Sequence, residues 1–174
     1  MDHDSIVEDW QKHAKKNDAK NFRFLLSLKV RDYGFDPDEV AAELHEQAFK
    51  SVDCTRCANC CKTMTVILDQ SDIDRIAEHL GMTAQVFIET YLEMNEEEQL
   101  YKIRQTPCPF LGSDNRCTIY SVRPACYREY PHTDKGGFAS RKYLHANNSQ
   151  QCPATFWIVE QMRARATGKG HRKG

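Results

Sequence analysis

The residues best suited to chemistry are eight cysteines, and four of them fall within eight positions. The dense group is Cys54-x-x-Cys57-x-x-Cys60-Cys61, and the later thiols are Cys108, Cys117, Cys126 and Cys152. A lone buried cysteine usually acts as a small apolar side chain. A group this dense instead indicates sulfur chemistry: metal ligation, cluster assembly or disulfide formation.

The cellular compartment bears on the choice among these three. The N-terminal stretch 1–5 is acidic and polar, where a secretory signal peptide would be basic and then apolar. No apolar run approaches the roughly 20 residues of a membrane span. We therefore expect a cytoplasmic chain with no membrane association. Disulfides are rare in that reducing compartment, so metal ligation is favoured.

The spacing of the first cysteines suits both zinc and iron–sulfur chemistry. A Cys-x-x-Cys pair can bring two sulfurs to one tetrahedral ion, as in zinc sites. The triple spacing from Cys54 to Cys60 is typical of the loop that holds a 4Fe–4S cluster, whose fourth ligand is a distant cysteine followed by proline. Cys108-Pro109 and Cys152-Pro153 both have that form. The spacing favours a 4Fe–4S cluster, with zinc as the alternative.

Cys61 extends the motif beyond one simple cluster. Adjacent residues of an extended segment point to opposite sides. We therefore expect Cys60 and Cys61 to serve different centres, unless one of them is not a ligand. The eight thiols divide evenly into two four-cysteine sites, and one cluster with spare cysteines is also possible.

Polar residues near the later cysteines are weaker candidates. His132, close to Cys126, is either a ligand or proton carrier or an ordinary loop residue. Arg116, Arg123 and Arg128 would balance thiolate charge, bind an anion or simply lie at the surface. No Ser-His-Asp or paired-carboxylate pattern is present, so a hydrolase is unsupported and the catalytic residues, if any, are unknown.

The elements that position these residues are predicted to be mainly helical. Helices are expected after Asp36-Pro37, Ser71, Thr83 and Cys152-Pro153, which supply caps or first-turn prolines. Short strands are expected at 63–68, 100–105, 116–120 and 138–144. The predicted fold class is α+β, mainly α-helical, with short strands and irregular metal-organised loops.

The composition is that of an ordinary soluble globular protein. The chain has 174 residues, of which 40% are hydrophobic and 28% charged, and its formal net charge is −1. We divide it into a helical extension (1–52) that packs on the core, a cysteine-cluster metal-binding domain (53–166) and a disordered basic tail (167–174). The charge balance and the acidic outer faces of the predicted helices argue against nucleic acid.

The combined cysteine pattern resembles the YkgJ-type cysteine-cluster family. The resemblance rests on the CxxCxxCC run, Cys108-Pro-Phe-Leu, Cys117-x-Ile-Tyr-x-x-Arg-Pro-x-x-Cys126 and the late Cys152. This mostly bacterial family is described as a zinc- or iron-chelating domain and includes flagellin lysine methylases, which are associated with an iron–sulfur centre. The resemblance implies that all eight cysteines bind metal. It also shows a departure: Tyr127 precedes Arg128, where the family often has arginine directly after the cysteine.

Three functions are compatible with these features. The first is an iron–sulfur protein that transfers electrons or supports a reaction. The second is a structural zinc module that presents a surface to a protein partner. The third is a protein-modifying enzyme similar to the flagellin methylases, but no Gly-rich loop for S-adenosylmethionine follows a strand. We expect a cytoplasmic metal-binding protein, iron–sulfur in preference to zinc.

Overall fold

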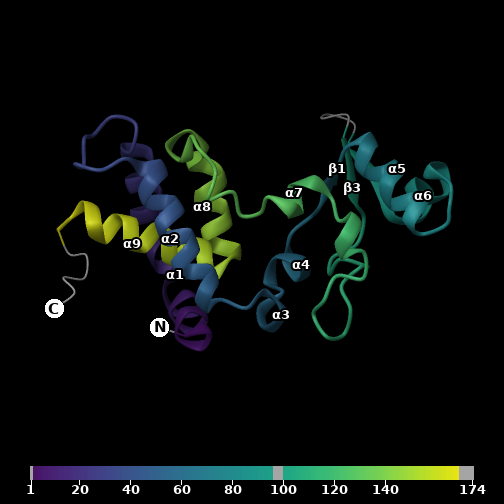
Figure 1. Ribbon diagram of the computed structural model, residues 1–174, viewed down its shortest axis with the longest axis horizontal. Helices are drawn as coiled ribbons and strands as arrows, with labels where there is room; N and C mark the ends of the chain where they lie inside the picture. The colour runs from purple at the N-terminus through teal and green to yellow at the C-terminus, as the bar shows by residue number, and fades with distance from the viewer. Residues whose placement is uncertain (1, 96–99, 169–174) are drawn as a thin grey trace. The chain divides into compact units, whose positions relative to one another are not determined.

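The computed structural model describes residues 2–95 and 100–168 of the chain. These residues are mainly α-helical with a small antiparallel sheet, which confirms the predicted fold class. They form two compact units (Figure 1). The first unit combines the described parts of 1–53 and 131–174, and the second is the described part of 54–130. The domain boundaries expected from the sequence stay a prediction.

The first unit is a helical bundle built from both ends of the chain. Its elements are α1 (His3–Ser27), α2 (Pro37–Ser51), the 3-10 helix η2 (Phe138–Arg141), α8 (Lys142–Gln151) and α9 (Pro153–Ala166). Helix α1 packs on α8 and α9, and α2 packs on α9 (Figure 1). Helix α9 supplies a continuous buried run from Pro153 to Val159, so it forms the centre of this apolar core.

Local capping explains where the bundle helices begin. The Asp36 carboxylate accepts a hydrogen bond from the Asp38 backbone N–H, and Pro37 occupies the first turn of α2. Cys152 is the N-cap residue of α9, and Pro153 is in its first turn. Both predicted helix starts are confirmed.

The second unit combines short helices with a three-stranded sheet. Its elements are α3 (Cys54–Cys57), α4 (Asn59–Thr63), β1 (Ile67–Leu68), α5 (Gln70–His79), α6 (Ala84–Tyr91), β2 (Leu92–Asn95), β3 (Leu100–Ile103), the 3-10 helix η1 (Tyr120–Val122) and α7 (Ala125–Arg128). The strand order is β1-β3-β2 and both pairings are antiparallel. Buried Ile73, Ile76 and Phe87 form a core with Leu68 and Ile103 of the strands.

Several predicted elements differ from the observed ones. Strands β1 and β3 lie inside the predicted segments 63–68 and 100–105 but are shorter. Helix α5 is capped by Asp69, whose carboxylate accepts from the Asp72 N–H, so the prediction of Ser71 as the cap is wrong. The Thr83 cap of α6 is confirmed, because the Thr83 hydroxyl accepts from the Val86 N–H.

Two predicted strands are wrong. In 116–120 the backbone makes one isolated bridge, Leu111 to Cys117, before it turns into η1. Residues 138–144 are helical, because the Asp38 carboxylate accepts from the N–H groups of Gly137 and Phe138 at 2.6 and 2.7 Å and so satisfies the start of η2. A short apolar run is compatible with both strand and helix periodicity, and here the distant Asp38 carboxylate favours the helix.

Two sequence-based expectations concern the membrane and the C-terminal tail. Among the described residues, no helix has both the length and the apolar character needed to span a bilayer. The predicted disordered tail lies outside the described residues except for Thr167 and Gly168, which follow the end of α9.

Candidate metal centre

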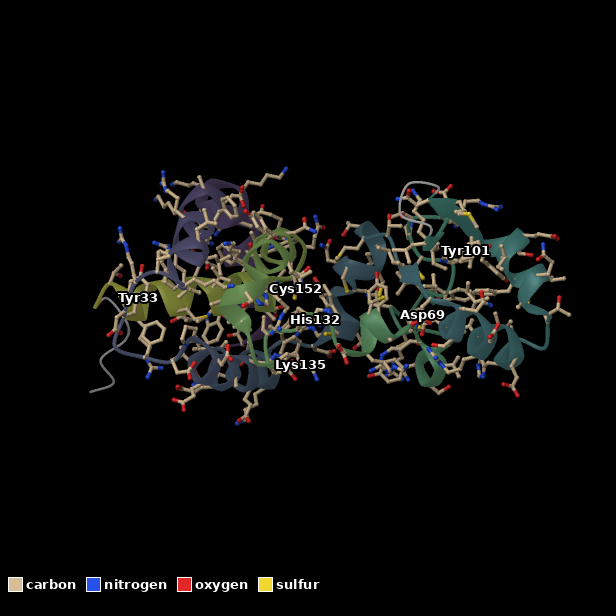
Figure 2. All side chains as sticks on the ribbon, turned by 90° about the horizontal axis from the view of Figure 1, so that it is seen from above. Tyr33, Asp69, Tyr101, His132, Lys135 and Cys152 are labelled. Atoms are coloured by element: carbon tan, nitrogen blue, oxygen red, sulfur yellow. The ribbon has the colours of Figure 1, made fainter. Side chains whose placement is uncertain are left out.

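The structure places seven of the eight predicted ligands in the second unit. Five of them line one pocket of about 530 Å³: Cys54, Cys60, Cys61, Cys108 and Cys117. Cys57 and Cys126 belong to the same unit but do not line this pocket. Cys152 belongs to the first unit, where it packs against the apolar core (Figure 2).

Backbone geometry folds the CxxCxxCC run onto the pocket. Helix α3 ends at Cys57, and buried Ala58 adopts a left-handed conformation (φ 49°), after which α4 begins. The chain changes direction at this break, between the pair Cys54 and Cys57 and the pair Cys60 and Cys61. The Cys108 N–H then donates to the Cys61 carbonyl at 2.9 Å. That bond ties the Cys108-Pro109 segment to the run, across a long sequence separation.

The relation between Cys60 and Cys61 differs from the prediction. Both residues lie in α4, which is helical and not extended, and their Sγ atoms are 4.0 Å apart. Sulfurs about 2.3 Å from a tetrahedral ion are about 3.8 Å from each other. The extended conformation assumed for these neighbours is therefore wrong, and their sulfurs are close enough to share one ion. The expectation that they serve different centres, unless one is not a ligand, stays a prediction. The number of centres stays a prediction.

The pocket walls are largely apolar, and besides the cysteines they contain arginines, tyrosines, Thr55 and Asn115. The apolar lining includes Val66, Ile76, Ile103, Phe110 and Ile119 from the core of the second unit. Arg116, Arg123 and Arg128 also line the pocket, which brings all three predicted arginines to one place. The Arg123 guanidinium lies 3.8 Å from the centre of the Tyr120 ring and donates to the Tyr120 carbonyl.

The thiols of the site differ in their ease of ionisation. A hydrogen bond with Cys60 lowers the pKa of Cys61 to about 7. Burial raises the pKa of Cys108 to about 11, and burial also raises the pKa of Cys117 and of Cys126. Burial, which raises the pKa of Cys108 and Cys117, therefore keeps these two thiols protonated unless a cation compensates the negative charge. A thiophilic metal does this, because its ligands are thiolates and its binding releases their protons.

The arrangement fits a sulfur-bound metal group in its donor chemistry. Soft thiolate ligands select zinc and iron–sulfur clusters. Within 2–95 and 100–168, however, no three His, Cys, Asp or Glu side chains converge closely enough to hold one ion. The sulfurs thus surround a pocket and do not meet at a point.

Two residues of the site escaped the sequence analysis. Asp72 is only 2% exposed; its carboxylate pairs with Arg75 and accepts from the Ala125 N–H at 3.1 Å, which fixes the start of α7 beside Cys126. The sequence pattern that could have indicated a buried role for Asp72 is its position one turn before Ile76, on the apolar face of α5. Tyr127 lines the pocket, where burial and the nearby cysteines raise its pKa far above the usual value, so its hydroxyl stays protonated.

His132 is placed in the first unit with Cys152 (Figure 2). Its backbone has a positive φ of 64°, and its carbonyl accepts a hydrogen bond from Arg141. Its role as a ligand or proton carrier stays a prediction.

A mainly helical fold with a cysteine-lined pocket defines a cysteine-cluster metal-binding domain. Residues 53–153 match the family model described as "CxxCxxCC: Putative zinc- or iron-chelating domain". The match spans more than half of the chain and includes all eight cysteines, so the chain belongs to this family, and the resemblance is confirmed. The family supports metal binding, with zinc or iron as the metal. No curated protein and no solved structure matched the chain.

Proposed function

We propose that the chain is a cytoplasmic iron–sulfur protein with a 4Fe–4S cluster in the cysteine-lined pocket. The observation that carries this proposal is the distribution of the sulfurs: five cysteines line one pocket, and no three of the described ligands converge on a point. In a cluster each cysteine binds a different iron, so its ligands are spread around a cavity. A single zinc ion instead needs its four ligand atoms, sulfurs or histidine nitrogens, gathered around one point.

Cysteines from two separate segments of the chain would hold the cluster. Cys54 and Cys60 come from the predicted cluster loop, and Cys108 is the one of the two predicted distant cysteines followed by proline that lines the pocket. The hydrogen bond from the Cys108 N–H to the Cys61 carbonyl ties Cys108 to the cluster loop, which supports the proposal that they bind the same cluster. Such a cluster supplies one-electron transfer at a potential set by hydrogen bonds to sulfur and by exposure. The proposed role is therefore redox or electron transfer.

A structural zinc site is the second candidate, and one distance favours it. The 4.0 Å between the sulfurs of Cys60 and Cys61 is close to the spacing of two ligands on a tetrahedral ion. In that case the domain would be a zinc module that presents a surface to a protein partner.

Metal and sulfide analysis after anaerobic purification separates the two candidates. We expect iron and acid-labile sulfide in equal amounts, together with broad visible absorption. Cys108→Ser should lose most of both, because it removes a ligand in the pocket. Cys152→Ser is the comparison from the first unit and tests whether that cysteine is also a ligand. Colourless wild-type protein that contains zinc and no sulfide would refute the cluster.

A further inference from the structure

The phenol of Tyr127 is a buried polar group that the fold itself does not explain. Its hydroxyl oxygen is shielded from solvent, and it has no hydrogen-bond partner among the described residues. Buried hydroxyls in folded proteins nearly always have a partner, so each exception calls for an explanation. Tyr127 is one of the residues that line the cysteine-lined pocket.

The frame around Tyr127 holds its ring in place. Its backbone N–H donates to the Pro124 carbonyl at 3.0 Å as α7 begins, and Asp72 anchors Ala125, two residues earlier. The ring packs against the core of the second unit, and its centre is 6.2 Å from that of Tyr130. The hydroxyl therefore keeps its position whether or not it has a partner.

The sulfur-bearing residues Cys60, Cys61 and Cys108 line the same pocket as Tyr127. Besides cysteines, the ionisable side chains of that lining are arginines and tyrosines, and an arginine cannot accept a hydrogen bond from the hydroxyl. A neutral thiol is a weak hydrogen-bond acceptor. A thiolate is a stronger one, because hydrogen bonds to charged acceptors are about twice as strong as neutral ones. Metal loading makes that change, since metal-bound cysteines are deprotonated.

We propose that Tyr127 donates an O–H···S hydrogen bond to a metal-bound thiolate of the pocket, that of Cys60, Cys61 or Cys108. Tyr127 is then a positioning residue that stabilises the loaded site and has no partner in the metal-free one. This inference rests on the proposed metal-binding function but holds for either metal. It assigns a role to a residue that is not itself a ligand.

Tyr127→Phe tests the proposal, because it removes the hydroxyl and keeps the ring. Loss of a hydrogen bond to a metal ligand typically weakens metal affinity by about 10- to 100-fold. We expect Tyr127→Phe to lose its metal to a competing chelator at a concentration at least about 10-fold lower than wild type does. The matched control is Tyr101→Phe, in a tyrosine on β3 of the same unit that is not among the pocket-lining residues, and it should behave as wild type.

Two further measurements separate this role from simple packing. The sulfur-to-metal charge-transfer band, recorded on the iron form or on a cobalt-substituted zinc site, should move to longer wavelength in Tyr127→Phe, because a thiolate without a hydrogen bond releases electrons more easily. The metal-free variant should unfold at the same urea concentration as metal-free wild type. Unchanged metal retention, or an equal loss of stability without metal, overturns the inference. Wild-type protein that holds no metal refutes the proposed function itself.

Discussion

At the scale of single residues, His145 makes the folding of the first unit sensitive to pH. Its side chain is fully buried and stacks on Phe138 with the ring centres 3.9 Å apart. Burial, together with the positive charges of Arg141 and His132, lowers its pKa from 6.5 to about 4. Between these two values the unfolded chain binds a proton that the folded chain excludes.

We therefore predict that the free energy of unfolding decreases as the pH falls, because folding keeps His145 unprotonated. Its contribution is complete above pH 6.5 and is lost progressively toward pH 4. Each pKa unit corresponds to about 1.4 kcal/mol, so wild type should lose about 2 kcal/mol more than His145→Phe between about pH 7 and pH 5. Urea unfolding at both pH values measures the difference. His79→Asn, at an exposed histidine, should keep the wild-type dependence, and an identical slope in His145→Phe would contradict the prediction.

At the scale of elements, very short helices position the cysteines, and single polar contacts hold them. Helix α7 has only four residues, too few to be stable alone. Its first N–H, that of Ala125, donates to Asp72 of α5, and its Cys126 thiol donates to the Ile67 carbonyl of β1 at 3.3 Å. The sequence predicted α5 from its apolar spacing. It could not predict that one acid on that helix anchors a segment 53 residues further along.

We predict that Asp72→Ala strongly destabilises the second unit. The substitution leaves Arg75, whose side chain is 29% exposed, without its carboxylate and removes the acceptor of the Ala125 N–H. Breaking such a largely buried pair costs about 3 kcal/mol or more in free energy of unfolding. Denaturant unfolding gives the size of the loss, and alkylation of Cys126 should become faster as α7 loosens.

The control for Asp72→Ala is Asp74→Ala, an exposed acid on the same helix. Its carboxylate accepts from Gln70 at the surface, so its loss should change the free energy of unfolding by less than about 0.5 kcal/mol. Similar losses in the two variants would show that Asp72 is not an anchor.

At the scale of the whole molecule, the two units differ in what stabilises them. The core of the first unit is built from large apolar side chains such as Leu25, Ile158 and Met162 on long helices. The second unit has a smaller core, short elements and seven of the eight thiols. Metal binding contributes folding free energy where the ligands are assembled by the fold.

We predict that metal removal loosens the second unit selectively. With a chelator, amide hydrogens of α3, α4 and β1–β3 should exchange faster, whereas those of α1, α2 and α9 should keep their protection. Hydrogen exchange with mass spectrometry, with and without chelator, tests this directly. A uniform loss of protection along the chain would show that the bundle also depends on the metal.

The sequence by itself determined the sulfur chemistry, the family resemblance and the helix starts at Asp36, Thr83 and Cys152. These depend on residue type and short spacing, which are local properties. The closeness of the Cys60 and Cys61 sulfurs comes from the short helix α4, which the sequence analysis did not predict. Only the tertiary structure decided which five cysteines line one pocket, and that Tyr127, whose buried hydroxyl has no hydrogen-bond partner among the described residues, lines the same pocket. Those two facts depend on contacts between segments far apart in the chain, and no local pattern encodes such contacts.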